Sequence, residues 1–191
     1  MNEWLTIENA TEFIHHSNAI ENIHHSEKWI MSTIKTNVYI PEITNHYEAL
    51  KYVTEQSGLP DVAGIKMLHE ILMKDLLIQL EENKNGEYRD YDVRVGSHRC
   101  PPFQEVEGLM TSLDDAISFS INLRNEKTGA ERAWTIHDSF EQIHPFGDGN
   151  GRVGRLLLNW IRRHYGLPML IVKYEDRFKY YNKIHKERKE K

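Results

Sequence analysis

The sequence predicts an all-α fold, a helical bundle with one short β-hairpin, and two observations support this prediction. Apolar side chains recur at spacings of three and four residues along most of the chain, as in amphipathic helices that share a core. Only residues 86–102 depart from that pattern. The 191 residues, of which 39% are hydrophobic and 28% charged, suit one globular domain. We therefore expect a single domain over residues 1–191, in which an N-terminal helical region (1–58) precedes a larger core (59–191).

Five apolar stripes mark the expected helices. The first is weak and lies near the N-terminus, and the second follows the turn at residues 58–60. The third and fourth occupy residues 104–123 and 133–144, and the fifth runs from a glycine-rich turn to the turn at residues 166–168. In chain order, the stripes consist of Phe13, Ser17 and Ile20; Ile65, Leu68, Leu72 and Leu76; Val106, Leu109, Met110, Leu113, Ile117 and Ile121; Ala133, Ile136, Phe140 and Ile143; and Val153, Leu156, Leu157, Trp160 and Ile161.

Residues 86–102 favour extended structure over helix. Residue types common in strands are frequent there, and glycine and proline oppose a helix. We therefore expect a short β-hairpin flap near residues 87–96. The residues behind this expectation are Tyr88, Tyr91, Val93, Val95, Gly96, Pro101 and Pro102.

Charge and composition exclude several classes of partner. The net charge is −5, so no overall positive field attracts nucleic acid or anionic lipid. The longest apolar runs are too short to span a bilayer, and the N-terminus lacks the features of a signal peptide. The single cysteine, Cys100, excludes an internal disulfide and fits a reducing compartment. We expect a cytoplasmic protein with no nucleic-acid or membrane partner, whose basic tail after Tyr181 is the frayed end of a helix.

Residues with reactive side chains gather between His144 and Arg155. The turn Gly149-Asn150-Gly151 lies at the start of the fifth helix, where the first backbone N–H groups lack partners and the helix dipole is positive. Glycine lets a phosphate approach the backbone closely. This turn therefore predicts an anion-binding site.

The charged residues around the turn extend this prediction. Arg152 and Arg155 are about 60° apart on the helix and suit the outer phosphates of a triphosphate. Asp148 would repel phosphate unless Mg²⁺ bridges the two. His144 ends the preceding helix and can act as a general base. Each feature alone is common in structural roles, but their joint occurrence in this order indicates nucleotide chemistry.

The stretch from His144 to Arg155 resembles the signature of the Fic family, His-x-Phe-x-(Asp/Glu)-Gly-Asn-Gly-Arg-x-x-Arg, at every specified position. The segment before it, residues 133–143, and the flap from Tyr88 to Pro102 are also similar to those of the family. The resemblance covers residues 60–182, and its motif is long and specific.

The resemblance implies an all-α Fic fold that transfers AMP from ATP to a hydroxyl side chain of a target protein, which can be the protein itself. In this scheme His144 deprotonates the target hydroxyl, and the Gly149-Asn150-Gly151 turn binds phosphate. Asp148 holds Mg²⁺ against the phosphates, while Arg152 and Arg155 contact the β- and γ-phosphate. The resemblance also allows a homo-oligomer.

Other segments gain expected roles from the same resemblance. The flap is expected to hold the backbone of the target beside the active site by strand addition. Phe146 would anchor the catalytic loop in the core. Tyr180 and Tyr181 resemble residues of the helix that helps to form the nucleobase pocket, although aromatic core packing explains them nearly as well. The centre of the flap consists of Val93, Arg94, Val95 and Gly96.

A second motif lies near the N-terminus. Residues 17–22 resemble the inhibitory motif of the family, (Ser/Thr)-x-x-x-Glu-(Gly/Asn), with Ser17, Glu21 and Asn22 at the specified positions. Ser17 and Glu21 are four residues apart and share a helix face. The resemblance implies that Glu21 pairs with Arg155, competes with the γ-phosphate and misaligns ATP. Because the motif precedes the core, the chain resembles Fic proteins with an N-terminal inhibitory helix.

Weaker signals leave alternatives open. His15-His16 and His24-His25 suggest a metal site, but no Cys, Asp or Glu completes a familiar zinc spacing, so we expect histidines on a polar helix. One alternative function keeps the fold and changes the reaction to removal of AMP or transfer of another phosphate-containing group. Another is a regulatory module that binds nucleotide without turnover, which the intact His144 argues against.

Overall fold

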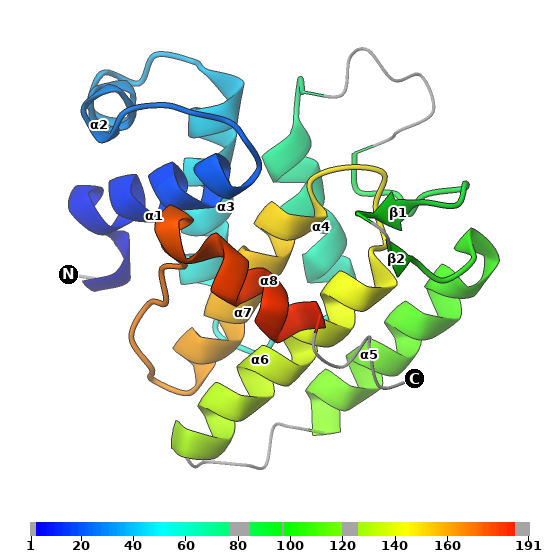
Figure 1. Cartoon of the computed structure of the whole chain (residues 1–191). Helices are drawn as coiled ribbons and strands as arrows, with labels where there is room; N and C mark the ends of the chain where they lie inside the picture. Colours follow the sequence, from blue (N-terminus) through cyan, green and yellow to red (C-terminus); the bar gives the residue numbers. More distant parts are fainter. Residues whose placement is uncertain (1–2, 77–84, 97, 120–125, 186–191) are drawn as a thin grey trace.

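A computed structural model describes residues 3–76, 85–96, 98–119 and 126–185 (Figure 1). These residues form α-helices, short 3-10 helices and one two-stranded sheet at the edge of the molecule, which confirms the predicted all-α class with a small β element. The α-helices are α1 (Ile7–Ile20), α2 (Glu27–Thr36), α3 (Pro41–Glu55), α4 (Val62–Met73), α5 (Val106–Phe119), α6 (Glu126–Ile143), α7 (Asn150–His164) and α8 (Arg177–His185). The 3-10 helices are η1 (Glu3–Leu5), η2 (Phe103–Glu105) and η4 (Tyr174–Asp176).

Helices α6 and α7 form the centre of the bundle (Figure 1). Helix α7 is buried along most of its length, and its apolar residues from Val153 to Ile161 lie in the main hydrophobic cluster. Helix α5 packs on α6, while α3 and α4 pack on α7. The loop between α6 and α7 therefore joins the two most central helices, and this position makes it a rigid support for a site.

The N-terminal helices pack on the same core. Helix α1 begins after Thr6, whose side chain accepts a hydrogen bond from the Asn9 backbone N–H at 3.1 Å, and α3 begins with Pro41 in its first turn. Apolar residues of α1 and α3 belong to the hydrophobic cluster that contains α6 and α7. Helices α2 and α3 were not separately expected from the sequence.

The hairpin lies further along the chain than predicted. Strands β1 (Arg94–Val95) and β2 (His98–Arg99) pair antiparallel, so the return strand falls beyond residue 96. The prediction of a hairpin is confirmed, but its boundary near residues 87–96 is wrong. Residues 87–93 do not form a strand, and Arg89 is the one buried residue among them.

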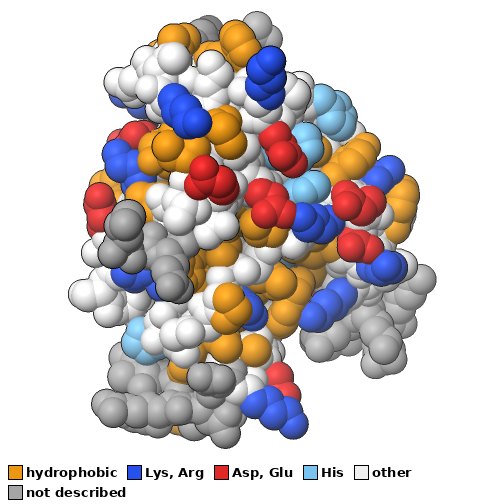
Figure 2. Space-filling view, turned by 90° about the vertical axis from the view of Figure 1, so that its left-hand side faces the viewer, with side chains coloured by type: hydrophobic (Ala, Val, Ile, Leu, Met, Phe, Trp, Pro, Cys, Tyr) orange, Lys and Arg blue, Asp and Glu red, His pale blue; other side chains and the backbone are white. Residues whose placement is uncertain are grey.

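Two expected segments extend past the described residues. Ile121 and the basic tail from Lys186 lie outside them, so nothing tests those expectations. Among the described helices, none combines the length and apolar character needed to cross a bilayer. Figure 2 shows one face of the molecule, on which acidic and basic side chains are intermixed around a group of histidines.

Candidate active site

The loop after α6 is anchored in the core by Phe146. Its ring is fully buried and stacks on the imidazole of His69 with 3.8 Å between the ring centroids. The Nε2–H of His69 donates to the backbone oxygen of Asp148 at 3.1 Å, and its Nδ1 accepts from the Gly86 N–H at 2.9 Å. Burial lowers the pKa of His69 to about 4, so the ring is neutral near pH 7. This packing fixes the loop that the sequence predicts to be catalytic.

Asn150 closes the same loop from the start of α7. Its Oδ1 accepts a hydrogen bond from the Phe146 N–H at 2.9 Å, and its Nδ2 donates to the Phe146 oxygen at 2.8 Å. The preceding Gly149 has a φ of 75°, a left-handed conformation that glycine adopts without strain. The buried Asn150 side chain therefore fixes the conformation of the loop. The phosphate contact expected of it stays a prediction.

His144 is the first residue beyond α6. Its backbone N–H still donates to the Phe140 oxygen at 2.9 Å, but its φ of 51° places it in the left-handed region. A non-glycine residue there costs roughly 1 kcal/mol or more. This conformation turns the chain out of α6 and places the imidazole at a cavity.

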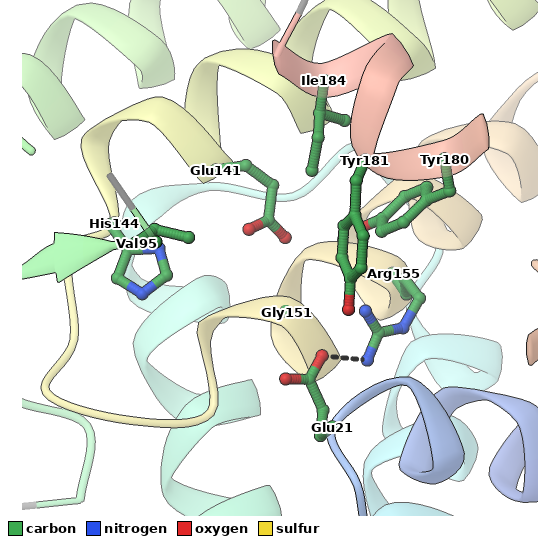
Figure 3. A pocket seen from close by; sticks show the side chains of 10 residues that line it. Glu21, Val95, Glu141, His144, Gly151, Arg155, Tyr180, Tyr181 and Ile184 are labelled. Atoms are coloured by element: carbon green, nitrogen blue, oxygen red, sulfur yellow. Dashed lines mark hydrogen bonds and ion pairs between the residues drawn. The ribbon is translucent and has the colours of Figure 1, made fainter. Parts of the chain in front are cut away.

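A cavity of about 420 Å³, the active-site cavity, collects residues from distant parts of the chain (Figure 3). The His144 imidazole lies near one end, and the guanidinium of Arg155 lies near the other. Side chains from α8 form one wall, and residues of the hairpin line it near His144. The lining residues are Glu21, Val95, Gly96, Glu141, His144, Gly151, Arg155, Tyr180, Tyr181 and Ile184. Residues predicted from four separate segments therefore meet in one place.

Arg155 is bound by the end of α1. Its Nη2 donates to Glu21 Oε1 at 2.7 Å and to the Ser17 backbone oxygen at 2.8 Å, while its Nε donates to Ser17 Oγ at 2.9 Å. Burial opposes the charged guanidinium, but the Glu21 carboxylate outweighs burial, and the pKa of Arg155 is raised. The contact between Glu21 and Arg155 that the resemblance implies is therefore present in the structure.

Asn22 shapes the turn that presents Glu21. Its N–H donates to the Ala19 oxygen at 3.0 Å, and the Ile23 N–H donates to the Asn18 oxygen at 3.0 Å. These two hydrogen bonds form a Schellman C-cap, which requires a left-handed residue, and Asn22 has a φ of 62°. Asparagine suits this position better than most residues, so Asn22 fixes where α1 ends and where Glu21 lies.

Arg152 and Asp148 lie outside the lining of the described cavity. The Arg152 side chain is buried, and its Nη2 contacts the Met73 sulfur at 3.3 Å. Burial lowers the pKa of Arg152, and Asp148 partly offsets this effect. The Asp148 carboxylate is 59% exposed, its Oδ2 lies 3.9 Å from the Arg152 Nη2, and its Oδ1 accepts from the Gly149 N–H at 2.6 Å. The roles expected of Arg152 with phosphate and of Asp148 with metal stay predictions.

Glu141 is a cavity residue that sequence reasoning missed. It is buried on α6, and a Cβ added to Gly154 would collide with its carboxylate, so the glycine makes room for this acidic group. Figure 3 shows the carboxylate pointing into the active-site cavity. The available signal was its position three residues before His144, next to the apolar stripe of the same helix.

The expected nucleobase residues are held by hydrogen bonds to α6 and α1. Nδ1 of His137 contacts the Gly154 backbone oxygen at 2.9 Å and must donate to it, so Nε2 accepts from the Tyr180 hydroxyl at 2.9 Å. Burial, followed by the charge of Arg155, lowers the pKa of His137 to about 3. The Tyr181 hydroxyl donates to the Ile20 oxygen at 3.1 Å. Both tyrosines line the active-site cavity, as their expected role requires.

The hairpin contributes Val95 and Gly96 to the cavity, whereas Val93 and Arg94 do not line it. The backbone oxygen of Val93 instead accepts from the Cys100 N–H at 3.2 Å, and Arg94 pairs with Arg99 in the sheet. Strand addition by a target protein stays a prediction.

Histidines near the N-terminus make contacts with the backbone of other segments. His15 Nδ1 contacts the His25 backbone oxygen at 2.8 Å, and His16 Nδ1 accepts from the Tyr174 N–H at 3.2 Å. Within the described part of the chain, no group of three or more His, Cys, Asp or Glu side chains is placed to hold a metal ion.

Comparisons with known proteins agree with this geometry. A family model described as the Fic/DOC family matches residues 60–161. The chain is 29% identical over 187 residues to Protein adenylyltransferase Fic of Nematostella vectensis, which covers 91% of this chain and 42% of that protein. It is 30% identical over 188 residues to Protein adenylyltransferase fic-1 of Caenorhabditis briggsae, which covers 91% of this chain and 36% of that protein. The chain thus spans less than half the length of these relatives.

A solved structure shares the fold. A Fic domain containing signaling protein from Bacteroides thetaiotaomicron superposes with a TM-score of 0.79 at 25% identity, over 92% of this chain and 70% of that chain. The family match over residues 60–161 includes the loop from His144 and both Arg152 and Arg155 of α7, whereas Glu21 lies outside it.

Proposed function

The chain belongs to the Fic/DOC family, and from this premise we propose that it is a protein adenylyltransferase restrained by its own Glu21. The observation that carries this proposal is that one cavity joins the imidazole of His144, the N-terminal end of α7 and the guanidinium of Arg155. A base, an anion-binding helix end and a cation are the groups that transfer of a nucleotidyl group from ATP needs. The names of the curated relatives support the same activity.

In the proposed reaction, a hydroxyl of the target protein attacks the α-phosphorus of ATP. A bond forms between the hydroxyl oxygen and this phosphorus, and the bond from the phosphorus to the oxygen of the departing pyrophosphate breaks. His144 accepts the hydroxyl proton. The hairpin would hold the target, which can include this chain, with its hydroxyl beside the imidazole, because Val95 and Gly96 line the cavity at that end.

The phosphates would lie along the start of α7. The Gly151 backbone borders the active-site cavity, and Arg155 lies further along the same helix, where it would contact the γ-phosphate. Arg152 would need to leave Met73 to contact the β-phosphate. Gly151 is suited to close approach, because a Cβ there would already collide with the Glu21 carboxylate.

Mg²⁺ is the proposed cofactor, and Asp148 is the residue that would hold it. Its carboxylate is a hard oxygen ligand with most of its surface exposed. A single protein carboxylate suits Mg²⁺, which commonly completes its shell with substrate phosphates and water. When bound, the ion would neutralise charge on the phosphates.

Glu21 is the proposed inhibitory residue. Its Oε1 forms an ion pair with the Arg155 Nη2 at 2.7 Å. The carboxylate also borders Gly151, where the phosphates would lie. Ser17 adds two more hydrogen bonds to the same guanidinium. A γ-phosphate would have to displace the carboxylate, so ATP would bind in an unproductive position while the pair persists.

Removal of AMP is a second candidate on the same site. Glu21 and His144 both line the active-site cavity, so a water between them could be oriented by one and exchange a proton with the other. The two reactions share their residues but differ in the role of Glu21, which would inhibit transfer and assist hydrolysis.

A cytoplasmic location, where ATP is abundant, is part of the proposal.

The test incubates the native chain and Glu21→Gly with Mg²⁺ and ATP labelled on either the α- or the γ-phosphate. We expect Glu21→Gly to gain the α label and the native chain to gain far less of it. Neither protein should gain the γ label. Transfer of the γ label would indicate phosphorylation instead. Binding of ATP without transfer of either label would favour a regulatory module.

A further inference from the structure

Arg89 is an unexpected buried arginine between α4 and the hairpin. Its residue surface is only 4% exposed, although arginine is usually found at the surface. Burial lowers the pKa of Arg89, but arginine remains protonated in proteins. A buried charge requires hydrogen-bond partners, and the structure gives it several.

All of the partners shown for the Arg89 guanidinium are backbone carbonyl oxygens. Nε donates to the oxygen of His144 at 2.9 Å, and Nη2 donates to that of Ile143 at 3.3 Å. The other contacts are from Nη1 to the oxygen of Tyr91 at 2.9 Å and from Nη2 to that of Pro101 at 2.7 Å. One planar group therefore contacts the catalytic loop and both ends of the segment that carries the hairpin.

The Arg89 backbone adds a further contact to the same loop. Its N–H donates to the Pro145 oxygen at 2.9 Å. Arg89 thus binds the carbonyl groups of three consecutive residues, Ile143 to Pro145. The last carbonyls of a helix have no partner within the helix, so Arg89 supplies one where α6 ends.

This contact matters because His144 has a left-handed backbone. A residue with a side chain keeps such a conformation only when its surroundings hold it there. The hydrogen bond from Nε fixes the carbonyl of His144 itself. The hydrogen bonds from Nη2 and the Arg89 backbone N–H fix the carbonyls of Ile143 and Pro145 on either side. The direction of the imidazole follows from this backbone.

We infer that Arg89 is a positioning residue that holds the His144 base and the hairpin in a fixed relation. The inference rests on the proposed function for its kinetic consequence, because the hairpin would hold the target and His144 would take its proton. Without Arg89, the acceptor hydroxyl and the base would no longer be aligned. ATP contacts would change little, because Arg89 does not line the active-site cavity.

The kinetic test compares Arg89→Met, Arg89→Lys and Arg163→Met, each combined with Glu21→Gly. Arg163 is a matched control, because its guanidinium also donates to a backbone oxygen, that of Gln56 at 2.6 Å. Arg163 lies in the last turn of α7, at the opposite end of that helix from the active-site cavity, which neither residue lines. The rate of automodification is measured against the concentration of labelled ATP. Arg89→Met should lower the maximal rate about 100-fold and leave the half-saturating ATP concentration within about twofold.

The lysine variant separates positioning from burial of charge. Lysine keeps the charge but donates from a single nitrogen, so it cannot reach the carbonyls of His144, Tyr91 and Pro101 together as the planar guanidinium does. Arg89→Lys should therefore retain only part of the activity, and Arg163→Met should match the parent. Unchanged maximal rates in both Arg89 variants, or an equal loss in Arg163→Met, would overturn the inference.

Hydrogen–deuterium exchange gives a readout that does not depend on transfer. Arg89→Lys should accelerate exchange in peptides that cover residues 91–101 and 144–149 together, whereas Arg163→Met should not. If the Glu21→Gly parent transfers no AMP, the proposed function fails, and exchange alone decides the role of Arg89. Unchanged exchange in both peptides would overturn that role, and Arg89→Lys serves as the folded variant if Arg89→Met does not fold.

Discussion

The Glu21 carboxylate lies 2.7 Å from the guanidinium of Arg155, although 134 residues separate them in the chain. This pair connects the end of α1 to the proposed phosphate site on α7.

Glu21→Gln should increase AMP transfer, because a neutral amide holds the guanidinium less strongly than a carboxylate does. The gain should be smaller than that of Glu21→Gly, which leaves no side chain to compete with the γ-phosphate. Initial rates with α-labelled ATP measure both. Glu8→Gln is the matched control on the same helix, since Glu8 is exposed, and it should leave the rate unchanged. A rate for Glu21→Gln no higher than that of Glu8→Gln would contradict inhibition by this carboxylate.

Ser17→Ala should relieve inhibition only in part. It removes the acceptor for the Arg155 Nε, while the Ser17 backbone oxygen and Glu21 continue to hold Nη2. A hydrogen bond to a charged group contributes roughly 1.5–3 kcal/mol, so the variant should also unfold at lower urea concentration. Rates that exceed those of Glu21→Gly would show that the hydroxyl, and not the carboxylate, dominates.

His144→Ala in the Glu21→Gly background should lower AMP transfer by roughly 10²–10⁴-fold, the contribution typical of a general base. ATP affinity, measured by titration calorimetry, should stay close to that of the parent. Loss of binding in parallel with transfer would instead assign the imidazole to nucleotide binding.

Asn150→Asp should destabilise the fold by roughly 1–3 kcal/mol, because the carboxylate cannot donate to the Phe146 oxygen and leaves that buried group without its partner. Urea unfolding at pH 7 measures this change. A loss of ATP affinity without any loss of stability would instead indicate that Asn150 contacts phosphate, as the family resemblance implies.

Stability should fall as the pH drops from 6.5 toward 4. Burial keeps the pKa of His69 at about 4 and that of His137 at about 3, and it lowers the pKa of His46 well below the usual range. In this interval the unfolded chain therefore binds more protons than the folded chain. Each histidine contributes a slope of about 1.4 kcal/mol per pH unit, and stability is fully present above pH 6.5.

Urea unfolding at several pH values tests this expectation. His69→Gln should reduce the slope near pH 5 by about one proton, or about 1.4 kcal/mol per pH unit. His164→Gln is the control for the substitution itself, since that histidine is exposed. Equal slopes for the native chain and His69→Gln would show that His69 takes up its proton in the folded state.

The sequence predicted the helix class and most of the site because both depend on short-range patterns. The spacing of apolar residues is visible on α4 to α7, and the residues from His144 to Arg155 are contiguous. Glu21 and Arg155 could be paired only through the family motif, because no local pattern relates residues so far apart.

Buried polar side chains account for what the sequence did not reveal. On α3, His46 lies fully buried within the apolar stripe and contacts Asn18 Oδ1 at 2.9 Å, which obscures the helical periodicity. The burial of Arg89 was not predicted either, since an arginine in a polar segment is expected to be exposed. The partners of such groups come from the tertiary structure, so periodicity alone does not locate them.

The guanidinium of Arg155 is only 2% exposed, and this burial affects how the proposed inhibition by Glu21 would be relieved. For a cation so shielded from water, loss of its anionic partner before another arrives is costly. If ATP binds as proposed, direct exchange of the Glu21 carboxylate for the terminal phosphate should therefore be favoured over stepwise loss of the ion pair. A nucleoside diphosphate, which lacks that last phosphate, should leave the ion pair of α1 and α7 in place.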